Sequence, residues 1–126
     1  MKIKTSNLIG RALDWAVAKC EGYEVDHDFT LAGIFMPGWF VQMGSNYWKP
    51  LETYTPSTNW SQGGPIIEQE KIKLDPRKGQ WEATIWNEAE MQNPAYGPMI
   101  LIAAMRCYCC AKLGDEVEVP DQLGKT

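Results

Sequence analysis

Apolar side chains recur every three to four residues near the start of the chain. They are Leu8, Ile9, Ala12, Leu13, Ala16, Val17 and Cys20. This spacing places them on one face of a helix, the face that packs against a core. Thr5 or Ser6 can cap the start of such a helix, and Gly22 can end it. We therefore predict a helix over residues 5–21.

The pattern after Gly22 is typical of strands. Phe29–Phe35 and Gly38–Met43 are rich in β-forming residues, with Pro37 and Gly38 as the expected turn between them. Residues 80–86 then alternate after a turn at residues 75–79. The alternation puts Trp81, Ala83 and Ile85 on one face and Glu82, Thr84 and Trp86 on the other. These segments predict a small antiparallel sheet.

The segment between these strands, Ser45–Gly64, has no clean period. It is rich in Pro, Ser, Thr, Asn, Gly and aromatic residues. This composition predicts a long ordered loop in the centre of the chain.

The last strong element runs from Gly97 and Pro98 to Gly114, and predicts a helix over residues 98–113. Apolar side chains cover nearly the whole circumference of this helix. Such a helix is buried inside its own domain or covered by a second subunit. Because burial on every side is hard to arrange in so short a chain, we expect a homo-oligomer.

These elements define an α+β fold: an N-terminal and a C-terminal helix packed on a small antiparallel sheet, with a long central loop. The length of 126 residues is that of a single domain, 1–126. Residues 115–126 hold Asp115, Glu116, Glu118 and Asp121, and we expect them to form an acidic, solvated tail.

Composition narrows the classes of function. The net charge is −4, and three arginines are not a basic patch for a phosphate backbone, which disfavours nucleic acid as a partner. The chain has no apolar run of the ~18 residues that span a membrane. Its first residues lack the apolar stretch of a signal peptide, so we expect it to stay in the cytoplasm.

The four cysteines are Cys20, Cys107, Cys109 and Cys110. Three of them lie within four residues of a predicted helix, where they cannot pair with one another without distorting it. We expect free thiols that pack as small apolar side chains, and neither a metal site nor a cofactor.

Three segments of the sequence resemble one family. They are Leu8–Ala18 with Gly10-Arg11-Ala12-Leu13-Asp14-Trp15, Thr55–Glu68 with Asn59-Trp60-Ser61-Gln62-Gly63-Gly64-Pro65, and Ile102–Tyr108 followed by Lys112–Pro120. In this order they resemble the NinX family of tailed enterobacterial phages and prophages. The resemblance implies an accessory protein of the infected bacterial cytoplasm, and it implies no particular reaction. Residues 22–53 fit the family pattern poorly, and residues 34–48 are where this member is expected to differ in specificity.

The stretch from Asn59 to Pro65 has the composition of a binding site. Two glycines allow the backbone to approach a ligand or to form an anion-binding nest. A tryptophan offers a stacking face, and its polar neighbours offer hydrogen bonds. The alternative is a tight turn whose tryptophan fills the core. The candidate ligand-binding residues here are Trp60, Ser61, Gln62, Gly63 and Gly64.

Arg106 lies in the middle of the apolar C-terminal helix, where an unpaired buried guanidinium is very costly. It therefore meets an internal carboxylate such as Glu68 or Asp14, reaches the surface, or faces a bound anion. Trp39, Trp48 and Trp86 can line a pocket for a planar ligand such as a nucleobase, or they can belong to the core.

Catalysis has little support, because His27 is the only histidine and stands between two aspartates in a predicted loop. Three functions are compatible with the sequence. The first, which we favour, is a non-catalytic binding module for a small, anionic, nucleotide-like molecule, suited to sequestering a host defence signal. The second is an inhibitor that contacts a host protein directly, and the third is a minor hydrolase.

Overall fold

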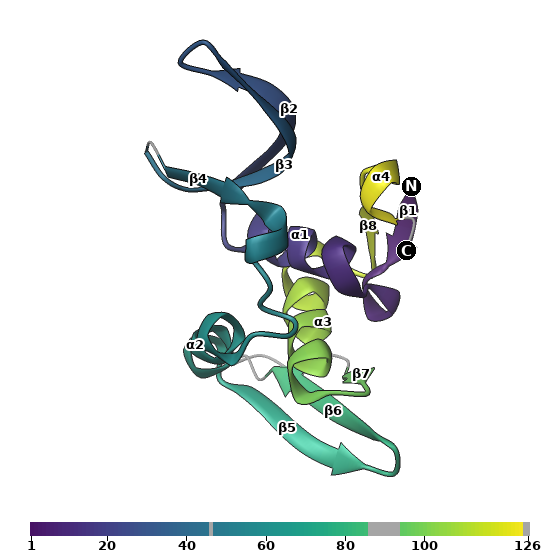
Figure 1. The fold of residues 1–126 in the computed structure, drawn as a ribbon. Coiled ribbons are helices and arrows are strands. Elements are labelled where there is room, and N and C mark those ends of the chain that lie inside the picture. The colour runs from purple at the N-terminus through teal and green to yellow at the C-terminus, as the bar shows by residue number, and fades with distance from the viewer. Residues whose placement is uncertain (46, 86–93, 125–126) are drawn as a thin grey trace.

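The computed structural model describes residues 1–45, 47–85 and 94–124 as an α+β fold (Figure 1). Its helices are α1 (Gly10–Cys20), α2 (Trp60–Glu70), α3 (Ile100–Leu113) and α4 (Asp121–Gly124), with 3₁₀ turns η1 (Thr5–Asn7) and η2 (Leu51–Thr53). Its strands are β1 (Lys2–Lys4), β2 (Glu24–Leu31), β3 (Ile34–Gly44), β4 (Tyr47–Pro50), β5 (Ile72–Arg77), β6 (Gln80–Ile85), β7 (Ala95–Gly97) and β8 (Glu116–Glu118). The strands form three antiparallel sheets, β1-β8, β2-β3-β4 and β5-β6-β7. The predicted fold class is confirmed, but the single sheet is replaced by three.

The core is organised around α3, which crosses the middle of the molecule (Figure 1). It packs against α1, α2, η1 and the strands β6 and β7. Alanine and cysteine side chains cover much of its surface, and such small groups let neighbouring elements approach closely. The chain itself therefore buries the apolar circumference of α3. The feature that suggested a second subunit has this explanation, and the expected homo-oligomer stays a prediction.

The N-terminal helix starts later than predicted. Thr5 and Ser6 form η1, and the Thr5 hydroxyl donates to the carbonyl oxygen of Gly114 at 2.8 Å instead of capping α1. The helix begins at Gly10, whose φ of +62° favours glycine. Gly22 follows its end with a φ of +84°, as the sequence indicates.

The β2–β3 hairpin turns at Ala32 and Gly33, not at Pro37 and Gly38. The Asp28 carboxylate accepts a hydrogen bond from the Gly38 amide at 2.7 Å, and Asp28 itself has a φ of +49°. The register shifts at this point, which is the mark of a β-bulge. Pro37 and Gly38 are therefore accommodated within β3, and the hairpin is one long curved arm (Figure 1).

The predicted central loop, Ser45–Gly64, is wrong in its main feature. The segment contains β4, η2 and the start of α2. α2 begins at Trp60 because the Asn59 side chain accepts a hydrogen bond from the Ser61 amide at 2.9 Å. The following strand pair is close to the prediction, with Trp81, Ala83 and Ile85 shielded from solvent on one face of β6, although Thr84 is buried too.

The acidic tail predicted at residues 115–126 is also wrong over its described part. β8 pairs with β1, so that Val117 faces Ile3, and α4 follows. Val119 and Leu123 are fully buried. The acidic side chains lie on the exposed side of an ordered element whose apolar residues belong to the core.

The four cysteines are free thiols. Among the residues that the structure describes, no cluster of His, Cys, Asp or Glu side chains could hold a metal ion. Within those residues, no helix is both long enough and apolar enough to cross a membrane.

Candidate functional site

An apolar pocket of about 230 Å³ opens where α2 and α3 begin and where β6 passes beside them. Seven residues line it: Ser57, Thr58, Trp60, Trp81, Met99, Ile100 and Leu101. Two tryptophans from different elements thus border one cavity. Aromatic walls with a few polar groups are typical of small-molecule sites.

Trp60 is the first residue of α2, and its side chain is 55% exposed. The interpretation in which it fills the core is therefore wrong. Its exposed indole faces the pocket, where it offers a surface for stacking. The Asn59 cap holds the helix start, and with it the backbone of Trp60, in place.

Gly63 brings α2 close to α3. A Cβ at this position would lie 2.7 Å from Leu101 Cδ2 and would collide with the carbonyl oxygen of Pro56. The glycine is needed for this approach and not for an unusual backbone angle. The predicted anion nest is wrong, because the Gln62 and Gly63 amides donate to the Asn59 carbonyl oxygen within the helix start.

Ser61 and Gln62 support the pocket without lining it. The Ser61 hydroxyl donates to the Asn59 side chain at 2.7 Å. The Gln62 side chain accepts from the Thr55 amide and donates to the Thr53 carbonyl oxygen at 3.0 Å. Both residues fix the chain that leads into α2. Gly64 is inside the helix, with Trp60 as its neighbour.

Asp14 holds the segment that leads into α2 from its position on α1. Its carboxylate is buried on α1 and accepts a hydrogen bond from the Ser57 amide at 3.0 Å. Burial raises the pKa of Asp14 to about 6, although the bonds to Ser57 oppose the shift. Ser57, which lines the pocket, is thus tied to α1 by a group that titrates in a mildly acidic range.

The start of α3 forms another part of the pocket wall. Its N-cap, Met99, makes no side-chain hydrogen bond to the first turn. The first amides of a helix have no partners inside the helix, and the helix dipole makes this end electropositive. The pocket therefore combines two indoles with a helix start at which an anionic group is favoured.

Arg106 lies in a different cavity. Its Nε donates to the Leu8 carbonyl oxygen at 2.7 Å, and its Nη1 donates to the Tyr96 carbonyl oxygen at 2.8 Å. These two carbonyl oxygens replace the carboxylate of Glu68 or Asp14 expected from the sequence. The guanidinium borders a cavity of about 390 Å³ that also includes Ser6 and Asn7. The structure does not bring it together with Trp60.

Trp39 and Trp48 lie on opposite faces of the β2-β3-β4 sheet. Trp48 pairs with Gln42, three residues from Trp39, and side chains alternate along a strand. Trp39 stacks on His27, with ring centroids 4.4 Å apart, while Trp48 packs against Phe29 at 4.8 Å. The two therefore do not line one pocket, and Trp86 lies outside the described residues.

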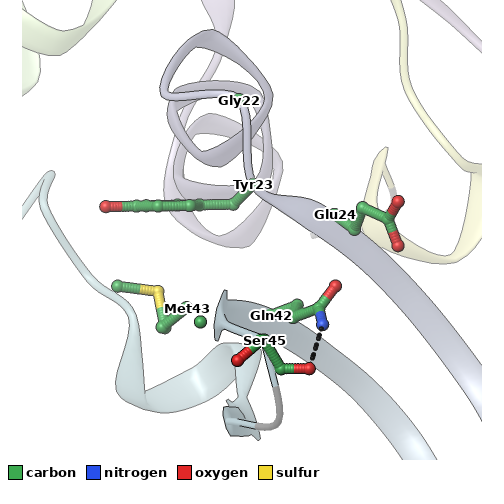
Figure 2. Close-up of a pocket in the computed structure, with 7 residues that line it drawn as sticks. Gly22, Tyr23, Glu24, Gln42, Met43 and Ser45 are labelled. Atoms are coloured by element: carbon green, nitrogen blue, oxygen red, sulfur yellow. Dashed lines mark hydrogen bonds between the residues drawn. The ribbon is translucent and has the colours of Figure 1, made fainter.

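A third, more open cavity of about 360 Å³ lies at the base of the hairpin. Figure 2 shows the Tyr23 ring above the Met43 side chain, with Glu24 pointing away on the other side. The Gln42 side chain closes one edge by donating to the Ser45 carbonyl oxygen at 3.2 Å. Sequence reasoning missed this cavity, because it forms only where the start of β2 meets the end of β3.

The fold and the pocket together define a small α+β protein with a tryptophan-lined cavity between two helix starts. The chain belongs to the NinX family of phage proteins, since the family model described as Bacteriophage P22, NinX matches residues 4–112. The match includes α1, α2 and nearly all of α3, and with them the pocket. No curated protein matches the chain.

Proposed function

We propose that this phage protein is a non-catalytic binding module that holds a small, anionic, nucleotide-like ligand in the pocket between α2 and α3. The observation that carries the proposal is the pairing of Trp60 and Trp81 at one cavity. Indoles stack on nucleobases of any sequence, because every base has a π-face. A volume of about 230 Å³ suits the planar part of such a ligand and leaves its polar part at the opening.

The anionic part of the ligand is proposed to lie at the start of α3. Ile100 and Leu101 belong to the first turn of α3 and line the pocket, and the N-cap residue Met99 makes no side-chain hydrogen bond to this turn. Phosphates and carboxylates bind at such helix starts through backbone amides and the helix dipole. This arrangement would recognise a nucleotide better than the corresponding nucleoside.

A protein that binds such a molecule without converting it lowers its free concentration. In the cytoplasm of an infected host, this would suit sequestration of a nucleotide-like defence signal. This part of the proposal rests on membership of a phage family and on the pocket, and it requires no reaction.

Native mass spectrometry of protein taken from infected cells tests the proposal first, because it reports a retained small molecule and the number of subunits together. Calorimetric titration with the four ribonucleoside monophosphates and their nucleosides then tests the chemistry. We expect at least one monophosphate to bind, and to bind more tightly than its nucleoside. Equal affinities for a monophosphate and its nucleoside would show that the anionic group is not recognised. If none of these compounds bound, the nucleotide-like class of ligand would be contradicted.

The variant Trp60→Ala should weaken the binding of that monophosphate by about 1–3 kcal/mol, a roughly five- to 150-fold rise in Kd, through loss of stacking. Tyr47→Ala is the matched control, because Tyr47 is a comparably exposed aromatic residue (60%) on β4, outside the pocket. An equal loss in both variants would show that Trp60 has no specific role.

The alternative functions make different demands. Direct inhibition of a host protein would use an exposed surface, and the chain has one in the β2–β3 hairpin. A hydrolase would show turnover, with or without a divalent metal. Two groups bear on the hydrolase alternative. His27, the single histidine, lies beside Asp28 on the exposed hairpin. Burial raises the pKa of the Cys107 thiol to about 12, far from the range of a reactive thiolate.

A further inference from the structure

The end of the β2–β3 hairpin carries an apolar surface that the core does not use. Leu31, Ile34 and Phe35 flank the turn and are 41%, 64% and 56% exposed. Leu31 pairs with Ile34 and Thr30 pairs with Phe35, so the three apolar side chains project from both faces of the turn. We call these three residues the hairpin tip. Large exposed apolar groups gathered at one place mark interaction sites more often than chance.

The hairpin is built to hold this tip in a fixed position. The Asp28 carboxylate ties the two strands together through the Gly38 amide at 2.7 Å. Phe29 packs edge-to-face on Phe40 at 5.7 Å and against Trp48 at 4.8 Å, which braces one face of the arm. An arm that is ordered before binding loses less conformational entropy when a partner binds.

The arm also carries a consistent charge. Glu24, Asp26 and Asp28 are exposed along β2, the edge strand of its sheet. Residues 22–48 contain no lysine or arginine. The hairpin therefore presents an apolar end on an acidic stem, and the complementary surface is basic around an apolar recess.

We propose that the β2–β3 hairpin is a docking arm for a second protein, one whose basic surface surrounds an apolar recess that receives the hairpin tip. A second copy of this chain fits less well, because pairing of two β2 edges would bring carboxylates together with no lysine or arginine between them. The bulge at Asp28 also interrupts the hydrogen-bonding edge that such pairing needs. An anionic membrane surface would repel the same carboxylates.

The partner can be trapped with a photo-crosslinking residue, p-benzoylphenylalanine, placed at Phe35 of the full chain in an enterobacterial cytoplasm. The same residue at Lys78, in the exposed turn between β5 and β6, is the positional control. We expect one protein to be linked from position 35 and not from position 78. A link to a second copy or to lipid, or equal products from both positions, would overturn the proposal.

Capture alone does not establish docking, so the trapped protein is purified and its binding is measured by calorimetry. Ile34→Ser should raise the Kd about tenfold or more, because it removes an apolar anchor. Ile9→Ser is the matched control: Ile9 is also exposed, at 47%, but lies at the start of α1, away from the arm. Both residues are exposed, and thermal melts should confirm that both variants fold.

The charge of the hairpin provides an independent test. Binding should weaken as salt is raised, and Asp26→Asn should reduce that salt dependence. Equal effects of Ile34→Ser and Ile9→Ser, or a salt dependence that Asp26→Asn leaves unchanged, would contradict the docking arm. Nucleotide binding should be unaffected by Ile34→Ser. A failure of the docking proposal can therefore be distinguished from a failure of the proposed nucleotide pocket.

Discussion

Gly63 and Gly64 are neighbours in α2, but their surroundings differ. A methyl group at Gly63 would press on Leu101 and on the Pro56 carbonyl, whereas at Gly64 its nearest contact would be Trp60 Cε3 at 3.7 Å. Gly63→Ala should therefore lower the free energy of unfolding by about 1–3 kcal/mol through overpacking. Gly64→Ala should raise it by about 0.5–1 kcal/mol, because alanine favours a helix over glycine. Urea unfolding measures both.

The two variants control for each other, since they make the same change one residue apart. A destabilisation of similar size in both would mean that α2 does not pack on α3 through Gly63. Such a result would also argue against the described shape of the pocket, because that shape depends on the close approach of α2 to α3.

Asp14 makes stability depend on pH. Its pKa is about 6 in the folded protein, against about 3.9 in an unfolded chain. Because the folded state holds the proton more tightly, the stabilising contribution is full below about pH 4 and is lost as pH rises to about 6. Two pKa units correspond to about 3 kcal/mol. Asp14→Asn should abolish this dependence, since its amide carries no charge and its oxygen can still accept from Ser57.

Unfolding midpoints in urea at several values between pH 4 and pH 7 measure the effect. Asp26→Asn, at an exposed position on β2, is the control and should leave the profile of the parent protein in place. The prediction fails if Asp14→Asn and the parent have parallel profiles.

At the scale of residues, the sequence predicts only part of the candidate site. The sequence points to Trp60, because a tryptophan among small polar residues is conspicuous in any chain, and this residue lines the pocket. Trp81 and Met99 were missed, since nothing in their local pattern distinguishes a pocket wall from a core face. They meet Trp60 only because β6 and the start of α3 fold beside α2.

At the scale of elements, Arg106 joins three parts of the chain. From α3 its guanidinium holds the carbonyl of Leu8, just before α1, and the carbonyl of Tyr96 in β7. Arg106→Met keeps most of the apolar stem but removes both bonds, and should cost about 1.5–3 kcal/mol of unfolding free energy. Arg106→Lys should recover part of the loss, because an ammonium group cannot reproduce the planar fork. Chemical denaturation measures the series.

The same series separates structure from binding. Arg106 borders a different cavity from Trp60, so folded Arg106→Met protein should bind the monophosphate with unchanged affinity. If Arg106→Met instead lost affinity for the monophosphate without losing stability, Arg106 would belong to the binding site.

Long periodic elements were predictable, and connections were not. The helix near residues 5–21 is predicted by its regular apolar spacing, and the helix near residues 98–113 by its start at Pro98 and its end at Gly114. The structure places them at Gly10–Cys20 and Ile100–Leu113. The hairpin turn was misplaced because Pro37 and Gly38 are strong local turn signals, which the bond from Gly38 to Asp28 overrides. α2 was missed because Gly63, Gly64 and Pro65 disfavour a helix locally, whereas packing against α3 stabilises it.

At the scale of the whole molecule, the first and last segments of the described chain pack against each other. Val119 and Leu123 are buried, and the Val119 amide donates to the Met1 carbonyl oxygen at 2.8 Å. Leu123→Ala should therefore cost about 2–5 kcal/mol, the range for a leucine removed from a core. Gln122→Ala, at an exposed neighbour, should change stability little. Equal thermal melts for the two variants would restore the interpretation of a solvated tail.

The pairing of β1 with β8 also sets the order in which a ribosome can complete this fold. β1 can pair only after Glu118 has been synthesised, and α1 can pack on α3 only after that helix, which begins 80 residues beyond the end of α1, has been synthesised. At about 5–20 residues per second, synthesis of that stretch takes on the order of ten seconds. The part of α1 that packs on α3 has no partner during this interval, while the hairpin arm, whose strands are adjacent in sequence, can already form. A nascent chain that stops before residue 118 would present its arm to a partner but leave its first strand unpaired.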